Sequence, residues 1–321
     1  KTAVALTCLG FDMAFNKTEL AEMGQAITWT SATFMIRRGG VDVEVKPSIV
    51  QDIAADVEKF LATNVIPVEG LRTLCGRLVC AASLLFVWRP FVDMLWAPIC
   101  QERSRGNAPA GCVWTAQVRI PLSWIRSFLQ GTSGTLVRRF ELSEYLKQGD
   151  VVRITLDASP WGIGGFLEEN YTAKEFFHGE LTEDDVKIFK HKIGDNKGQQ
   201  TWEALTILVA LRLWAPRWKG RRVTLSVRSD SVSALTALLR FKNAGEGSSF
   251  IARELAIDIA ESVYRPSVIS HVPGVSNIIA DELSRWHEPG RFPKLPLYLR
   301  GASLRMLPSR DASFYRTLLP P

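Results

Sequence analysis

The sequence predicts an α/β fold for the C-terminal part of the chain, and three observations lead to this prediction. Between residues 150 and 288, short runs of strand composition are followed by runs with helical spacing. The first three strand-like runs follow one another directly, as in a meander, and the later ones alternate with helices. Hydrophobic residues make up 46% of the 321 residues, enough to bury the cores of two domains. These patterns together predict a mixed five-stranded sheet with flanking helices.

Each element of this sheet has its own signal. Apolar or alternating runs predict five strands, at Val151–Leu156, Trp161–Glu168, Tyr171–Phe177, Val223–Val227 and Val268–His271. Apolar residues at helical spacing predict four helices, over Thr201–Trp214, Ser231–Phe241, Phe250–Tyr264 and Asn277–Trp286. The highly charged stretch Gly179–Gln200, which precedes the first of these helices, is predicted to be a long loop.

The rest of the chain divides into three parts. Residues 1–46 predict a small β-rich unit, in which Ile27–Ile36 has strand composition ahead of a turn at Arg37–Gly40. Residues 47–149 show helical spacing and predict a mostly helical region. Residues 289–321 contain six of the 16 prolines and form a tail that we expect to wrap around the domain or to fray.

The charge of the chain is patterned along its length. The net charge of +6 fits a polyanionic partner but is modest for 321 residues. Residues 201–250 carry eight Lys or Arg against three acids, whereas residues 151–200 carry six against nine. A local basic face is therefore a better interpretation than a generally basic protein.

Cysteine usage and hydropathy indicate the compartment. The five cysteines are odd in number, absent after Cys112, and lack the spacing of a zinc site, so we expect an intracellular protein of the cytoplasm or nucleus. The most apolar stretch, Leu78–Trp88, has 11 residues, fewer than the roughly 20 that span a bilayer. We expect no membrane partner. Because the chain begins at Lys1 without a methionine, it is interpreted as a fragment of a longer protein.

Four acidic residues stand at the ends or beginnings of predicted elements. Asp157 ends the first strand of the sheet, and Asp230 follows the fourth. Glu203 lies in the first turn of an apolar helix, and Asp281 lies on the last helix. Singly, Asp157 and Asp230 could be caps, and Glu203 could complement a helix dipole. The order and spacing of all four favour a joint site instead.

Clustered carboxylates have a specific chemical use. Their oxygen atoms suit hard divalent cations, and several of them lie close together only where cations neutralise their charge. In a site with two metal ions, one ion generates the attacking hydroxide and the other stabilises the leaving oxygen. The four acids therefore predict a metal-dependent hydrolase.

The segments that carry these acids resemble the RNase H domains of reverse-transcribing elements. In that family Asp, Glu, Asp and Asp occur in this order on the first strand, the first helix, the fourth strand and the last helix. Leu156–Gly165 looks like the opening of the domain, with glycines that allow close approach on the second strand. His271–Arg285 looks like the segment that closes it in long-terminal-repeat retroelements. The resemblance covers about 135 residues and implies an RNase H-like domain over residues 150–288.

The resemblance implies roles for individual residues. It makes Asp157, Glu203, Asp230 and Asp281 catalytic ligands of two Mg²⁺ ions, which Mn²⁺ could replace. His271 stands ten residues before Asp281, where many family members have a histidine that aids product release; it could equally be a strand-end histidine. The implied substrate is an RNA–DNA hybrid, and no small-molecule cofactor is expected.

The N-terminal half resembles other parts of a reverse transcriptase. Leu9–Thr18 and Ile27–Trp29 look like the end of the polymerase palm, which makes residues 1–46 a palm remnant. Leu71–Pro90 resembles the thumb and connection, which we assign to residues 47–149. No Tyr-x-Asp-Asp turn precedes residue 10, so this chain alone is not expected to polymerise DNA. An upstream polymerase segment is a further expected partner.

A basic and aromatic stretch follows the Glu203 helix. In Trp214–Arg222, two tryptophans are interleaved with four cations, Arg217, Lys219, Arg221 and Arg222. These cations could bind a phosphate backbone, or the stretch could simply be a solvated turn before a strand. Recognition of a hybrid would depend on backbone shape and 2′-hydroxyl contacts, with little base specificity.

Three functional hypotheses remain. The leading one is metal-dependent endonucleolytic hydrolysis of the RNA strand of RNA–DNA hybrids. The second is a non-catalytic RNase H-like module that binds nucleic acid or a polymerase subunit. The third, a DNA-strand transferase such as an integrase, is disfavoured because those enzymes place their glutamate on a late helix, whereas here Glu203 comes second.

Overall fold

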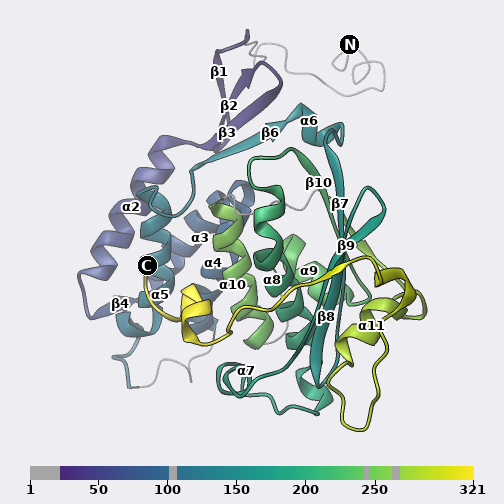
Figure 1. The fold of residues 1–321 in the computed structure, drawn as a ribbon. Coiled ribbons are helices and arrows are strands. Elements are labelled where there is room, and N and C mark those ends of the chain that lie inside the picture. The colour runs from purple at the N-terminus through teal and green to yellow at the C-terminus, as the bar shows by residue number, and fades with distance from the viewer. Residues whose placement is uncertain (1–21, 101–106, 242–245, 262–267) are drawn as a thin grey trace, which may run out of the picture.

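A computed structural model describes residues 22–100, 107–241, 246–261 and 268–321 (Figure 1). The first 21 residues, which include the Leu9–Thr18 segment of the predicted palm remnant, lie outside the described residues. So does the end of the predicted helix Phe250–Tyr264, after residue 261. Among the described residues, no helix is both long enough and apolar enough to cross a membrane.

The C-terminal half is built on the predicted mixed sheet. Its five principal strands are β7 (Asp150–Ala158), β8 (Gly162–Glu169), β9 (Thr172–Glu180), β10 (Val223–Ser229) and β11 (Val268–His271). The strand order is β11-β10-β7-β8-β9-β12, with β8 antiparallel to both β7 and β9 and β10 parallel to both of its neighbours. The α/β fold class and the mixed five-stranded sheet are therefore confirmed. The sixth strand, β12 (Ser303–Leu304), comes from the C-terminal tail and pairs parallel with β9.

Helices cover both faces of the sheet. The helices are α8 (Gln199–Trp218), α9 (Val232–Arg240), α10 (Glu246–Ala260) and α11 (Ile278–Ser284). Neighbouring residues of a strand point to opposite faces: Leu167 of β8 belongs to the large core cluster that includes α8, whereas Phe166 packs with Ala280 and Leu283 of α11. Helix α11 therefore lies on the face opposite α8, as Figure 1 shows.

The predicted loop Gly179–Gln200 is wrong in part, because it contains helix α7 (Glu183–Phe189) and a short 3₁₀ turn at Asn196–Gly198. Thr182 and Asp185 form a reciprocal capping box at the start of α7, each side chain bonding to the backbone N–H of the other. Phe189 at the end of the helix is buried against Trp202. The capping box and the apolar Phe189 are local signals of a helix, but the many charged residues of the stretch favoured a loop.

The N-terminal half combines a second sheet with a helical bundle. The sheet has the order β1-β2-β3-β6, from β1 (Ala26–Trp29), β2 (Ala32–Arg37), β3 (Gly40–Val45) and β6 (Val137–Glu141). The strand composition predicted over Ile27–Ile36 is confirmed, but the stretch forms two strands, a hairpin that turns at Thr30, whose φ is 53°. The two adjacent polar residues Thr30 and Ser31 mark the turn in the sequence.

The helices of this half surround a shared core. They are α2 (Pro47–Leu61), α3 (Val68–Leu84), α4 (Arg89–Cys100), α5 (Thr115–Leu129) and the short α6 (Leu142–Tyr145), with a two-stranded ribbon of β4 (Val65–Pro67) and β5 (Cys112–Trp114). One hydrophobic cluster runs from these helices into the C-terminal half without interruption. Phe86, for example, stacks on Phe241 with ring centroids 5.6 Å apart.

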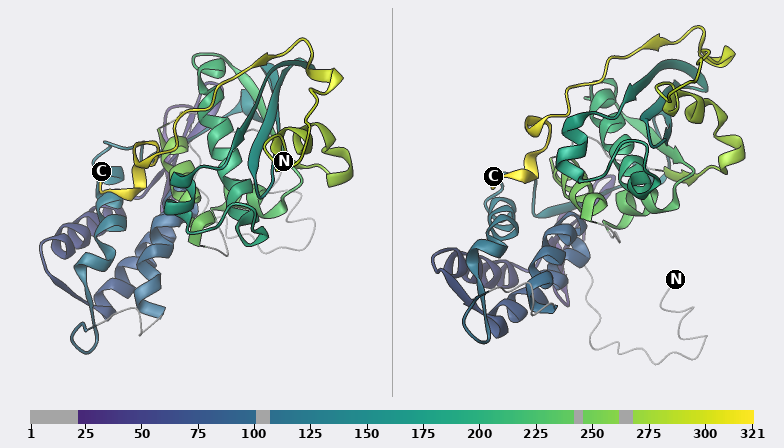
Figure 2. Two further views of the ribbon diagram at one scale, coloured as in Figure 1. Left: turned by 60° about the horizontal axis from the view of Figure 1, so that its bottom comes forward. Right: turned by 90° about the horizontal axis from the view of Figure 1, so that it is seen from below.

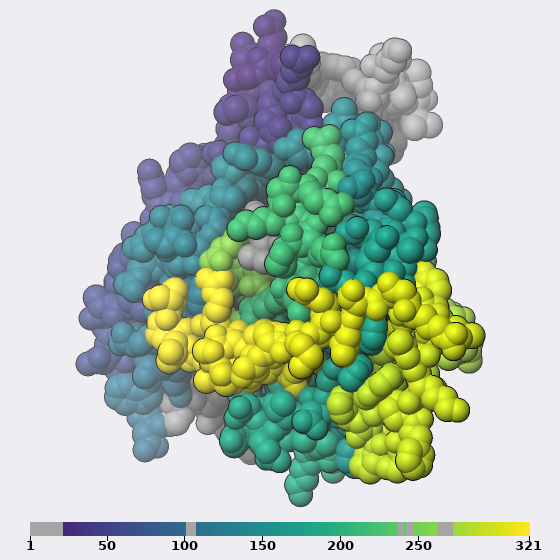
Figure 3. Space-filling view, viewed as in Figure 1, coloured from purple at the N-terminus to yellow at the C-terminus, as the bar shows by residue number. Residues whose placement is uncertain are grey.

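The C-terminal tail crosses the molecule as an extended strap. Figures 2 and 3 show it leaving the α11 side, running along the β9 edge of the sheet and ending beside the N-terminal helices. Arg310, 5% exposed, binds Asp185 through two nitrogens and donates to the Glu180 carbonyl. Farther along, Thr317 donates to buried Glu254 of α10, and the guanidinium of Arg316 lies over the Trp124 ring of α5. The tail is thus anchored by buried polar contacts at several points.

Candidate active site

Asp157 is the penultimate residue of β7, where the strand ends beside α11. Its side chain is almost fully buried. Ser284 of α11 donates to Oδ2 over 2.6 Å, and Asn277, just before α11, donates to Oδ1 over 3.5 Å and to the Leu156 carbonyl over 3.1 Å. These bonds fix the Asp157 carboxylate between the central strand and the last helix.

The approach of α11 to the sheet depends on glycine. A Cβ atom at Gly164 of β8 would lie 2.4 Å from the backbone N of Ser284, and one at Gly162 would lie 2.8 Å from its carbonyl oxygen. Only residues without a side chain allow the helix backbone to lie this close to the strand. The close approach that the glycines of this segment predict is therefore present, and it brings Ser284 to Asp157.

Glu203 enters the site from the other face of the sheet. It lies in the first two turns of α8, whose neighbouring side chains are mostly buried and apolar. Gln199, one turn earlier, donates to Glu203 Oε1 over 3.2 Å and to the Ala158 carbonyl over 2.7 Å. Gln199 therefore ties the Glu203 carboxylate to the end of the strand that carries Asp157.

Asp230 and Asp281 complete the group. Asp230 directly follows β10, and its Oδ2 would lie 3.3 Å from a Cβ atom at Gly274. Asp281 is on α11, with its side chain 39% exposed, and it pairs with Arg285 over 2.6 Å. Each of the four acids thus stands where the sequence places it, on two neighbouring strands and two helices.

The carboxylates interact electrostatically. The pKa of Asp157 is raised to about 7, chiefly by burial and also by the negative charges of Asp230 and Asp281, against the hydrogen bond from Ser284. Burial also raises the pKa of Glu203, and the charge of Asp230 adds to the rise, whereas bonds from Ser231 and Gln199 oppose it. All four acids therefore belong to one electrostatic cluster.

The residues of this cluster fit a hard divalent cation. Carboxylate oxygens are its preferred donors, and a cation would remove the repulsion that raises these pKa values. Two buried amide oxygens beside the acids, Gln199 Oε1 and Asn277 Oδ1, accept no hydrogen bond from any described group, so they could accept one from a hydrated ion. Over the described residues, however, no three acidic, His or Cys side chains converge closely enough to hold a metal, and Ser284 and Arg285 bond the carboxylates of Asp157 and Asp281.

Of the other predicted residues, His271 lies beside the acids in the sheet, whereas the basic stretch lies apart from them. Backbone pairing places His271 opposite Ser229 at the end of β11, but its side chain lies outside the described residues. Arg217 pairs with Glu175, and Arg221 pairs with Asp150 and Glu169. Lys219 and Arg222 are exposed. Because Arg217 is 14 residues beyond Glu203 on α8, the basic stretch begins about 21 Å farther along the helix, at the other end of the sheet.

Sequence reasoning did not single out the residues that hold the acids. Asn277 and Ser284 lie within the segment that carries the family resemblance, and Gln199 lies one turn before Glu203. Polar residues three or four positions from an expected ligand on the same helix would have been a usable signal, since they share its face. The contacts across the sheet could be found only from the structure.

Two histidines, His178 and His287, lie in contact just beyond the C-terminal end of α11. His178 of β9 stacks on Trp286 with ring centroids 4.3 Å apart, and its Nδ1 lies 3.1 Å from Nε2 of His287. Burial, followed by the charge of His287, lowers the pKa of His178 to about 4. The folded protein therefore favours the neutral ring.

This arrangement predicts a pH-dependent stability. A lowered histidine pKa stabilises the fold fully above pH 6.5, and the stabilisation is lost as the pH falls towards about 4. His178→Phe keeps the ring against Trp286, so its melting temperature should decrease less than that of the wild type over this pH range. Thermal denaturation followed by circular dichroism measures the difference. His191→Phe, at a ring packed edge-on against Trp202, is the control, and parallel pH profiles of wild type and His178→Phe would contradict the prediction.

The strand order and the helices on both faces define an α/β protein with a mixed five-stranded sheet. No family model matches the sequence, and no curated protein matches it either. Among solved structures, the RNase H1 of the halophilic archaeon Halobacterium salinarum is 15% identical, with a TM-score of 0.29, and the match covers 42% of this chain and 92% of that one.

Two further solved structures match a longer part of the chain. A foamy viral protease-reverse transcriptase in complex with double-stranded DNA is 14% identical, with a TM-score of 0.28, over 77% of this chain and 37% of that one. The same kind of protein in complex with an RNA/DNA hybrid is 14% identical, with a TM-score of 0.26, over 84% of this chain and 32% of that one. At TM-scores this low, the fold class rests on the topology of this chain itself.

Proposed function

We propose that this protein is a metal-dependent endonuclease that hydrolyses the RNA strand of RNA–DNA hybrids. The observation that carries the proposal is the gathering of four acids around the buried carboxylate of Asp157. Burial and the charges of Asp230 and Asp281 raise the pKa of Asp157, and Gln199 links Glu203 to the same strand end. Acids that repel one another at a buried carboxylate destabilise a fold unless a cation neutralises them, so a function in metal binding explains their presence.

The chain's own residues prepare the site for such chemistry. Asp157, Glu203, Asp230 and Asp281 would hold two Mg²⁺ ions, or Mn²⁺ in their place. When bound, the ions would activate the attacking water and stabilise the leaving oxygen. Ser284 and Gln199 orient the carboxylates of Asp157 and Glu203 before any ligand binds. Arg285 holds the exposed carboxylate of Asp281 and must release it for that oxygen to serve as a ligand.

The substrate follows from the resemblance to retroelement RNase H domains. On that basis the partner is an RNA–DNA hybrid, recognised through its backbone and 2′-hydroxyl groups. Lys219 and Arg222 are the members of the predicted basic stretch that are left free to contact phosphates, because Arg217 and Arg221 pair with acids. The same proposal includes an origin in a retroelement reverse transcriptase. Residues 1–46 would then be part of its palm and residues 47–149 part of its thumb and connection. A polymerase segment would be a partner.

Metal dependence tests the proposal directly. Wild-type protein should cleave a labelled RNA–DNA hybrid in Mg²⁺, and a chelator should abolish the cleavage because the acids then lack their cations. Readdition of Mg²⁺ or Mn²⁺ should restore it. Gel analysis of hybrid, double-stranded DNA and single-stranded RNA of one sequence shows which substrate is cut. Hybrid binding without metal-dependent cleavage would instead support the non-catalytic module, and cutting of double-stranded DNA alone would overturn the proposal.

A further inference from the structure

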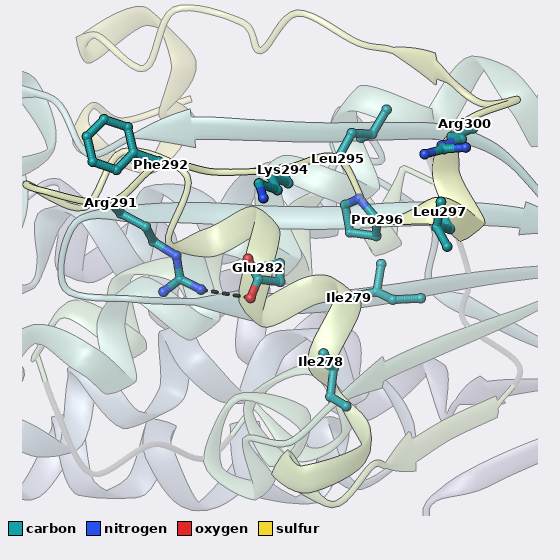
Figure 4. A pocket seen from close by; sticks show the side chains of 10 residues that line it. All are labelled: Ile278, Ile279, Glu282, Arg291, Phe292, Lys294, Leu295, Pro296, Leu297 and Arg300. Carbon is teal, nitrogen blue, oxygen red and sulfur yellow. Dashed lines mark hydrogen bonds and ion pairs between the residues drawn. The ribbon is translucent and has the colours of Figure 1, made fainter.

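A groove lies between α11 and the first part of the tail. Its lining residues come from these two segments, and its volume is about 610 Å³, within the range of sites that hold small ligands. Figure 4 shows α11 on one side of the groove and residues 291–300 along the other. The lining residues are Ile278, Ile279, Glu282, Arg291, Phe292, Lys294, Leu295, Pro296, Leu297 and Arg300.

The groove carries a net positive charge that the protein leaves uncompensated. Its one acid, Glu282, pairs with Arg291 over 2.8 Å, the contact drawn as a dashed line in Figure 4. Lys294 and Arg300 are exposed, and neither side chain forms an ion pair with any residue in the described part of the chain. Two cations therefore face the groove without a partner, which suits a ligand with more than one negative charge.

The groove also exposes aromatic and aliphatic surface. Phe292 is 91% exposed and stands between Arg291 and Lys294 in the sequence, and Leu297 is 71% exposed. An exposed aromatic ring flanked by cations is the arrangement that binds single-stranded nucleic acid, since the ring stacks on a base while the cations contact phosphates. An acidic peptide would use the cations but would leave the ring without a function.

The groove adjoins the acidic cluster through one helix. Glu282, on its wall, follows Asp281 directly, and Ile278 lies one turn before Asp281 on α11. The helix that carries Asp281 therefore also forms one wall of the groove. This neighbourhood favours a nucleic acid over other polyanions as the ligand.

We infer that this groove binds a single nucleic-acid strand that extends beyond the hybrid at the cleavage site. Lys294 and Arg300 contact its phosphates, and Phe292 stacks on one of its bases. The inference rests on the proposed function, because that function places the hybrid at the acidic cluster. It adds a contact outside the family's carboxylate site, built from the tail of this chain.

A binding assay separates this inference from the proposed function. Fluorescence anisotropy of labelled hybrids with Ca²⁺ in place of Mg²⁺ compares a blunt hybrid with one that has a single-stranded overhang at either end. Lys294→Glu/Arg300→Glu should weaken binding of the overhang hybrid about tenfold and reduce the slope of log K against log salt concentration by about 1.4, the value expected for two lost phosphate contacts. Binding of the blunt hybrid should change less than about twofold.

Two further variants make the result specific. Phe292→Ala, at a ring without a role in the core, should weaken overhang binding by about fivefold or more and leave the melting temperature unchanged. Lys59→Glu/Arg119→Glu makes the same charge change on the exposed faces of α2 and α5, far from α11 in Figure 1, and should not distinguish the two hybrids.

Three outcomes overturn the inference: equal affinities of the groove variants and wild type for the overhang hybrid, an equal loss with both hybrids, or competition by poly-glutamate but not by oligonucleotides. A protein that binds the overhang through the groove but cuts no hybrid overturns only the proposed function. A protein that cuts hybrids with the same overhang preference in every variant overturns only the groove.

Discussion

Replacing Asp157 with Asn is expected to reduce cleavage of RNA–DNA hybrid by roughly 10³-fold or more. Asparagine keeps the size of the side chain and can still accept the bond from Ser284, but it removes the charge at the centre of the cluster. The measurement is the single-turnover rate at saturating enzyme with Mg²⁺. Asp52→Asn, at an exposed side chain on α2, should leave the rate unchanged.

The same substitution should not impair folding. A carboxyl group whose pKa rises to about 7 on folding stabilises the protein at low pH, and that stabilisation is lost as the pH rises through this value. Without metal at pH 8, Asp157→Asn should therefore melt at or above the wild-type temperature. Full activity would refute the role of Asp157, and loss of activity together with a lower melting temperature would indicate a structural role instead.

Replacing Arg310 with Ala is expected to give the largest loss of stability. Arg310 and Asp185 are both almost fully buried, and their ion pair joins the tail to the start of α7. Removing one partner leaves the other charge buried and unpaired, which costs about 3–5 kcal/mol. Denaturant unfolding should show this decrease in the free energy of unfolding.

A matched variant distinguishes the buried pair from a general effect of the tail. Arg305 also lies on the tail, but its side chain is 47% exposed and 3.6 Å from Glu175, so Arg305→Ala should cost less than about 1 kcal/mol. Arg310→Lys keeps the charge and loses the two-nitrogen contact, and it should be intermediate. Equal losses in the two alanine variants would show that burial of the Arg310 pair is not the cause.

The sequence was sufficient for the sheet and for the place of each acid in it. Strand composition and helical spacing act locally, and the five strands and the helices α8 to α11 are found where these patterns predict them, whereas α7 is not. The carboxylates could be named because Asp157 and Asp230 each stand at the end of an apolar strand, where a side chain is aimed from a rigid element.

Contacts between distant segments could not be predicted in this way. Arg310 and Asp185 are 125 residues apart, and nothing local marks either as a partner of the other. The strap that they anchor, and the groove that the strap forms with α11, are therefore visible only in the structure. For the same reason, the pairing of Arg217 with Glu175 was not evident, and the basic stretch looked more accessible than it is.

The contact between Gly164 and the Ser284 backbone has a consequence for the precision of the site. Asp157 is the ladder partner of Gly164, and the strand that carries Gly164 lies against the Ser284 backbone of α11, the helix that carries Asp281. Main-chain atoms have no rotamers to exchange, so thermal motion changes this spacing less than it would if two side chains lay between the elements. The geometry available to a pair of ions is thus determined by the absence of a single methyl group.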